Sequence, residues 1–128
     1  MKNILRVLAL VVLAGCITAC TGVSQSTMRT KDDYQKVWNA CIDVVADVQF
    51  SVSSTDPVSG LIIADQAVIG GQGMVSRLNI RLFKALTSTE VSVKFIPPPG
   101  TIGGGGTAER YVEALKQRIP DLESVVLK

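Results

Sequence analysis

Residues 77–82 alternate between polar and apolar side chains, and this alternation limits the fold more than any other feature of the chain. The apolar positions are Leu78, Ile80 and Leu82, and the polar ones are Arg77, Asn79 and Arg81. Successive side chains of a strand point to opposite faces, so one face is expected to be buried and the other to meet water. Because parallel sheets are covered on both faces, the pattern predicts an antiparallel sheet covered on one side.

Three further segments are predicted to be strands of the same sheet. Residues 50–54 and 61–68 flank a turn at residues 56–60, where proline and glycine supply the required backbone angles. A strand around residues 91–95 alternates valine and phenylalanine with serine and lysine, after a turn at residues 87–89. Short loops between neighbouring strands indicate a four-stranded meander.

Two amphipathic helices flank the predicted meander. The first is expected to begin at Thr30 as N-cap, with Asp33 completing a variant of the capping box. Its apolar residues recur at three- and four-residue spacing and include Trp38 and Cys41, which are predicted to be buried. The second helix is expected to run from about Thr107 to Pro120. The predicted fold is therefore α+β, with helix, four-stranded antiparallel meander and helix, and with both helices packed on one face of the sheet.

The N-terminus has the pattern of a secretory signal. Lys2 and Arg6 precede a short apolar stretch, and residues 13–16 read Leu-Ala-Gly-Cys, which resembles the lipobox of bacterial lipoproteins. The stretch is shorter than the roughly 20 apolar residues that a membrane-spanning helix needs. Residues 1–15 are therefore predicted to be a lipoprotein signal peptide, with Cys16 as the acylated residue and Cys20 as the alternative.

Small polar residues without periodicity follow the signal. Residues 16–30 are predicted to be an acylated cysteine and a flexible tether, and residues 31–128 a single domain. The expected location is the bacterial cell envelope, on the outer membrane and facing the periplasm. In Gram-negative bacteria an aspartate after the acylated cysteine usually retains a lipoprotein at the inner membrane, and neither Ile17 nor Thr21 is that residue.

Charge and glycine patterns argue against nucleic acids and nucleotides as ligands. Removing residues 1–15 lowers the basic residues from 13 to 11, which equals the 11 acidic residues of the chain. A nucleic-acid binder is expected to carry a basic surface instead. The glycine-rich residues 100–107 resemble a phosphate-binding loop, but Gly106 stands where that motif needs lysine. These residues are predicted to be a flexible linker, with a weak anion site at the start of the second helix as the alternative. The glycine-rich residues 70–73 are predicted to be a hairpin loop, with a functional flap as the alternative.

Residues suited to catalysis are scarce. The chain contains no histidine, the commonest general base and metal ligand. Asp43 and Asp47 lie four residues apart on the first helix but lack further ligands for a metal. No catalytic, cofactor or metal site is expected. Cys41 is interpreted as a buried apolar residue. A disulfide between Cys41 and Cys20 is the alternative if Cys16 is acylated. Arg77, Arg81 and Lys94 are interpreted as a solvated face, with contact to anionic lipid or an acidic partner as the alternative.

Two sequence segments resemble a group of small bacterial lipoproteins. They are Tyr-Gln-Lys-Val-Trp-Asn-Ala at residues 34–40, and residues 50–64, which include Asp-Pro-Val-Ser-Gly-Leu-Ile-Ile-Ala. The group is similar to the repeated domain of BamC, a lipoprotein of the outer-membrane β-barrel assembly machinery. The resemblance covers roughly residues 31–119 and departs from the group at Gln49, where a glycine is usual. It implies the fold and an envelope setting, without catalytic residues.

Together these features predict a membrane-tethered, non-catalytic interaction module. It is expected to be held by N-terminal acyl chains and to contact an envelope protein of unknown identity through its sheet face or its loops. The alternative is a small carrier or sensor of a lipidic or apolar ligand, held between the helices and the sheet. A carrier needs a cavity, whereas the dense apolar stripes favour a closed core.

The acylation prediction is checked by the intact mass of the protein extracted from membranes. We expect a chain that begins at Cys16, or at Cys20, with added acyl mass. A Cys16→Ser variant, or a Cys20→Ser variant if the alternative holds, is expected to lose that mass. An unmodified full-length mass would contradict the prediction.

Overall fold

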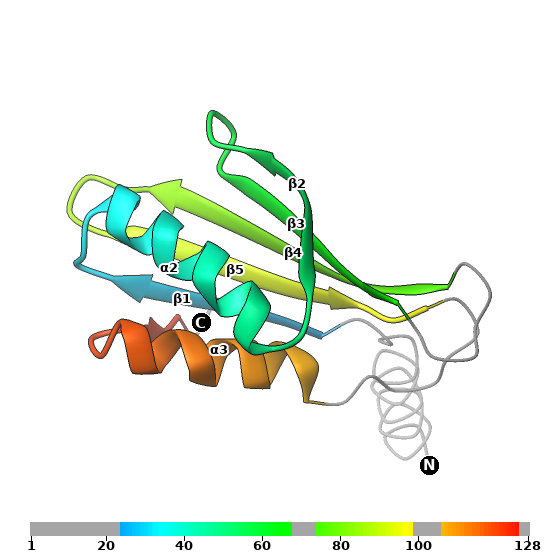
Figure 1. The fold of residues 1–128 in the computed structure, drawn as a ribbon. Coiled ribbons are helices and arrows are strands. Elements are labelled where there is room, and N and C mark those ends of the chain that lie inside the picture. Colours follow the sequence, from blue (N-terminus) through cyan, green and yellow to red (C-terminus); the bar gives the residue numbers. More distant parts are fainter. Residues whose placement is uncertain (1–23, 68–73, 99–105, 126–128) are drawn as a thin grey trace, which may run out of the picture.

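The computed structural model describes residues 24–67, 74–98 and 106–125, which form an α+β domain (Figure 1). Six antiparallel strands and two helices lie in this part of the chain. The strands are β1 (Ser24–Thr30), β2 (Ser51–Asp56), β3 (Leu61–Ala67), β4 (Val75–Lys84), β5 (Thr89–Ile96) and β6 (Glu123–Ser124). The helices are α2 (Tyr34–Asp47) and α3 (Thr107–Arg118). Neither is long and apolar enough to cross a membrane.

The strands are ordered β2-β3-β4-β5-β1-β6 in a single sheet. The register of β4 and β5 places Leu78 opposite Phe95 and Ile80 opposite Val93, so that buried side chains meet across the ladder. Figure 1 shows α2 and α3 side by side on one face of this sheet. The predicted α+β class, the antiparallel pairing and the meander from β2 to β5 are therefore confirmed. The predicted number of four strands is too low, because β1 and β6 extend the sheet beyond β5.

The core fills the space between the helices and the inward face of the sheet. Helix α2 contributes one stripe that includes Trp38 and Cys41, as its periodicity predicts. Helix α3 contributes Tyr111 and Leu115, and Leu122 closes the end of the core. The largest side chains without exposed surface are Tyr111, Met28, Ile62, Leu78, Ile80, Leu115 and Ile119.

One buried hydrogen bond joins the two helices across this core. The hydroxyl of Tyr111 donates to the carbonyl oxygen of Cys41 at 2.7 Å. Burial holds the pKa of the Tyr111 hydroxyl well above its usual value, so it stays a donor. Burial also raises the pKa of the Cys41 thiol to about 12, which makes it an unreactive, protonated group. The interpretation of Cys41 as buried apolar packing is confirmed, whereas Cys20 lies outside the described residues.

The prediction that residues 16–30 form a flexible tether is wrong for residues 24–30. These residues are β1, which pairs with β5 over its whole length and with β6 at its end. Only Met28 is a large apolar residue in this segment, and Ser26 and Thr30 face the same side. The polar composition hid the strand, because ladder hydrogen bonds come from the backbone and need no apolar side chain. The domain therefore includes Ser24, and residues 16–23 lie outside the described part of the chain.

The first helix also begins later than predicted. Asp33, rather than Thr30, is the N-cap of α2, and its carboxylate accepts a hydrogen bond from the Lys36 amide at 3.3 Å. Thr30 is the last residue of β1, and its hydroxyl donates to Asp121 at 2.6 Å. The Asp121 carboxylate thereby ties the segment after α3 to the end of β1.

We expect Tyr111→Phe to lower the free energy of unfolding by about 1–2 kcal/mol, because the Cys41 carbonyl loses a buried donor. Urea denaturation followed by Trp38 fluorescence measures the change. The matched control is Tyr34→Phe, because Tyr34 is half-buried and its hydroxyl has no hydrogen-bond partner among the described residues. Equal losses for the two variants would contradict a special role of the Tyr111 bond.

Candidate functional site

Among the described residues, the structure does not bring together the acidic and cysteine residues that the sequence analysis considered for catalysis or metal binding. Asp43 and Asp47 contact Arg118, with nitrogen–oxygen distances of 3.8 and 2.7 Å. Groups of acidic or cysteine side chains able to hold a metal ion are not found in residues 24–67, 74–98 and 106–125. Cys16, Cys20 and residues 70–73 lie outside those ranges. Of the glycine-rich residues 100–107, Gly106 and Thr107 are described: Gly106 has a left-handed backbone, and Thr107 is the first residue of α3.

Arg77, Arg81 and Lys94 lie on the face of the sheet opposite the helices, but they do not form one continuous basic strip. Arg77 forms two hydrogen bonds with Asp65, at 2.8 and 3.2 Å, and these bonds lower the pKa of the Asp65 carboxyl. The guanidinium of Arg81 lies 6.0 Å from the centre of the Phe83 ring. Arg81 and Lys94 thus lack a carboxylate partner in the described part of the chain.

A different site stands out at one end of the sheet, which we term the hairpin pole. It consists of the β2–β3 turn (residues 57–60), the end of β4 with the β4–β5 turn (residues 83–88) and the start of α2 (residues 31–35). Strand β1 runs toward this pole, since Thr30 pairs with Thr89 there and Ser24 pairs with Phe95 at the other end. The described chain therefore enters the sheet at the end opposite the hairpin pole (Figure 1).

Apolar side chains at the hairpin pole are exposed to an unusual degree. Leu86 in the β4–β5 turn and Val58 in the β2–β3 turn have relative exposures of 105% and 98%, and Phe83 has 49%. Single exposed apolar residues are common on protein surfaces, but a cluster at one end is typical of an interaction site. No periodic sequence signal marks them, because both turns lie outside the alternating segments.

A groove of about 390 Å³ lies between the β2–β3 turn, the end of β4 and the start of α2. Val58 and Phe83 line it, whereas Leu86 lines the hollow beside the β4–β5 turn. The ring of Tyr34 also lines the groove, and it stacks on Trp38 at a centroid distance of 6.3 Å. Trp38 is buried, so its stacking on Tyr34 holds this wall of the groove in place.

The β2–β3 turn is held in place by Gly60 and Asp56. Gly60 has a left-handed backbone with φ of 74°, and its carbonyl accepts a hydrogen bond from the Leu82 amide at 2.8 Å. Asp56 accepts bonds from the amides of Val58 and Ser59, and bonds from the Ser59 hydroxyl and amide lower the pKa of its carboxyl. The exposed Val58 is therefore presented by a braced turn.

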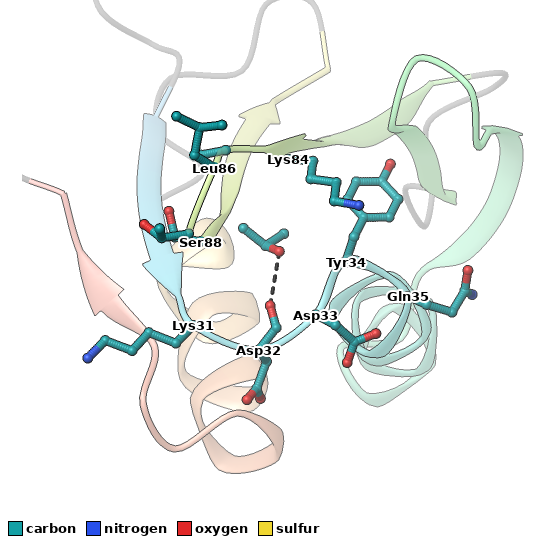
Figure 2. Close-up of a pocket in the computed structure, with 11 residues that line it drawn as sticks. Lys31, Asp32, Asp33, Tyr34, Gln35, Lys84, Leu86 and Ser88 are labelled. Atoms are coloured by element: carbon teal, nitrogen blue, oxygen red, sulfur yellow. Dashed lines mark hydrogen bonds between the residues drawn. The ribbon is translucent and has the colours of Figure 1, made fainter.

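A second hollow, of about 500 Å³, separates the start of α2 from the β4–β5 turn (Figure 2). The hydroxyl of Thr89 donates to the carbonyl oxygen of Asp32 at 3.0 Å and links the two walls. Asp32 also pairs with Lys36 at 2.9 Å. The side-chain amines of Lys31 and Lys84 form no ion pair with a carboxylate in the described ranges. Walls that mix polar and apolar side chains are typical of surfaces that contact other molecules.

Comparisons with known proteins do not assign the chain to a family. No family model and no curated protein match it. One similar solved structure is that of DynU16, a protein of the dynemicin biosynthetic locus, with 17% identity and a TM-score of 0.47. The match covers 78% of this chain and 48% of DynU16, so the chain spans about half the length of that protein. The resemblance to the BamC domain stays a prediction.

Gly60→Ala tests whether the β2–β3 turn is braced as described. A Cβ at Gly60 would overlap the carbonyl oxygen of Leu82, in addition to the strain of a positive φ. We expect a loss of at least about 2 kcal/mol in the free energy of unfolding, measured by urea denaturation. The matched control is Gly106→Ala, where φ is also positive but no atom lies within 4 Å, so that about 1 kcal/mol is expected. Equal losses at the two glycines would contradict the close approach at Gly60.

Proposed function

We propose that this protein is a membrane-tethered, non-catalytic interaction module of the bacterial cell envelope. In this proposal Cys16, or alternatively Cys20, is acylated and anchors the chain to the outer membrane on its periplasmic side. The hairpin pole then contacts an envelope protein. The observation that carries the proposal is the full exposure of two aliphatic side chains, Leu86 and Val58, on the two turns at one end of the sheet, where Val58 lines an apolar groove and Leu86 lines a second hollow.

The positions of the anchor and the pole support this arrangement. Eight residue steps separate Cys16 from Ser24 and span at most about 28 Å, and the four steps from Cys20 span about 14 Å. Strand β5, with eight residues, extends about 25 Å between the hairpin pole, where it begins, and the entry end of the sheet. A partner at the pole therefore does not compete with the anchor for the same end of the domain.

The filled core favours an interaction module over a carrier of apolar ligands. A ligand held between helices and sheet would need the volume that Tyr111, Met28 and the inward residues of β4 and β5 occupy. The hollows at the hairpin pole instead have polar and apolar walls near the surface, as protein contact sites do.

Site-specific photocrosslinking in membranes of the producing bacterium tests the proposal. A photoreactive residue at Leu86 or Val58 is expected to give the same discrete protein adduct from both positions. The control position is Glu113, which is exposed on α3 and away from the pole. An adduct of equal yield from Glu113, or none from the pole, would contradict the proposed docking site.

The variant Leu86→Asp, combined with the photoreactive residue at Val58, tests the chemistry of the contact. We expect the adduct yield to fall at least about tenfold, because a carboxylate would have to be desolvated in an apolar contact. Stability is expected to stay within about 0.5 kcal/mol, since Leu86 packs against nothing in the free domain. Saturable binding of an apolar fluorescent probe, unaffected by Leu86→Asp, would favour the carrier instead.

A further inference from the structure

The face of the sheet opposite the helices is left uncovered by the described elements (Figure 1). We term it the bare face, and the strand registers assign its residues. They are Ser51, Ser54 and Asp56 of β2, Leu61, Ile63, Asp65 and Ala67 of β3, Val75, Arg77, Asn79, Arg81 and Phe83 of β4, Glu90, Ser92, Lys94 and Ile96 of β5, Gln25, Thr27 and Arg29 of β1, and Glu123 of β6. The carboxylates of Asp56 and Glu123 thus belong to the outer strands of this face. A sheet face of this size without a covering layer needs either water or a partner surface against it.

The charges of the bare face are arranged so that its centre is positive. Toward one side Arg77 pairs with Asp65 at 2.8 Å, and toward the other Arg29 pairs with Glu90 at 2.7 Å. Between these pairs, Arg81 and Lys94 have no carboxylate within 4.0 Å among the described residues. The two cations lie on the adjacent strands β4 and β5, in neighbouring rungs of the ladder.

The central cations also do not donate to the side chain of Asn79, which lies beside them in the register. Lys94 lies opposite Asn79 in the register, and Arg81 is two residues along the same strand as Asn79. The side-chain oxygen of Asn79 is nevertheless buried without a hydrogen-bond donor. The donors of Arg81 and Lys94 are thus not used within the face, and both residues are exposed.

Apolar side chains lie beside these cations. Leu61 is directly opposite Arg81 and Ile63 directly opposite Asn79, and both are partly exposed. The half-exposed ring of Phe83 lies 6.0 Å from the Arg81 guanidinium. Cations next to aromatic and aliphatic groups suit the boundary between lipid headgroups and acyl chains, where the apolar parts insert and the charges meet phosphates.

We propose that the bare face lies on an anionic phospholipid leaflet, with Arg81 and Lys94 binding the phosphates of its headgroups. The proposal rests on the acyl anchor of the proposed function. Two cations contribute too little to hold a free protein on a membrane, and stable attachment needs a second signal. An anchor joined to β1 by at most eight residue steps supplies that signal, because it keeps the leaflet within about 28 Å of the sheet. The helices then face the periplasm, and the turns of the hairpin pole stay free at the side, with Phe83 belonging to both surfaces.

Lysine footprinting of the acylated full-length product tests this orientation. The protein is placed in vesicles of phosphatidylcholine or in vesicles that also contain phosphatidylglycerol. A water-soluble reagent that modifies amines then labels the lysines, and mass spectrometry gives the rate of labelling at each lysine. We expect Lys94 to react at least about fivefold more slowly in the anionic vesicles. Lys36 and Lys116, on the helices, are expected to keep their rates.

A charge reversal at the second cation gives an independent check. Arg81→Glu is expected to return Lys94 to the rate seen in phosphatidylcholine, because it removes one of the two phosphate contacts and repels the leaflet. The matched control is Arg110→Glu, an equal change of charge on α3, which is expected to leave Lys94 protected. If both variants return Lys94 to the labelling rate seen in phosphatidylcholine, the specific role of the bare face is overturned.

The outcomes separate this inference from the function proposed above. If the full-length product from the bacterium carries no acyl chains and does not float with vesicles, the anchor itself is refuted. An acylated protein that floats while Lys94 reacts equally in both vesicles would refute only the bare-face contact. Protection of Lys94 in native membranes but not in anionic vesicles would also overturn it, in favour of an acidic protein on this face.

Discussion

The ladder between β4 and β5 is the interaction on which the other features of the domain depend. Its register aligns the inward residues Leu78 and Ile80 with Phe95 and Val93, so that one apolar surface forms for both helices to cover. The same register brings Arg81 and Lys94 together on the opposite face. A shift by one residue would exchange the two faces, because side chains alternate along a strand. Core and exposed surface are thus fixed by one set of backbone hydrogen bonds.

The two proposed contact surfaces differ in how the fold supports them. The hairpin pole is made of turns, and its exposed aliphatic groups are held by Gly60, Asp56 and the Tyr34–Trp38 stack. The bare face is made of strands that are hydrogen-bonded to one another, and these bonds hold the face rigid. Turns suit a contact in which side chains enter a partner's groove, whereas a broad sheet face suits an extended surface such as a leaflet. Apart from the first turn of α2 at the hairpin pole, both proposals keep the helices out of the contact.

Prediction from the sequence succeeded where side-chain periodicity reflects burial. The stripe through Trp38 and Cys41, the alternation at Leu78 and Ile80, and the start of the second helix near Thr107 were all confirmed. It failed at residues 24–30, because a strand with Met28 as its one large apolar residue has no pattern to detect. The N-cap was misplaced for the same reason, since Thr30 belongs to that strand. The exposed Leu86 and Val58 had no periodic context that could mark them as a cluster.

The amino-acid sequence by itself determined the α+β class, the amphipathic faces of the elements and the absence of histidine chemistry, because these depend on residue type and local spacing. Only the tertiary structure decided that β1 joins the sheet between β5 and β6, that Arg77 is neutralised by Asp65, and that Leu86 and Val58 share one end. The physical reason is that these features arise from pairing between segments distant in the chain. Such pairing is set by backbone hydrogen bonds and register, which local composition does not encode.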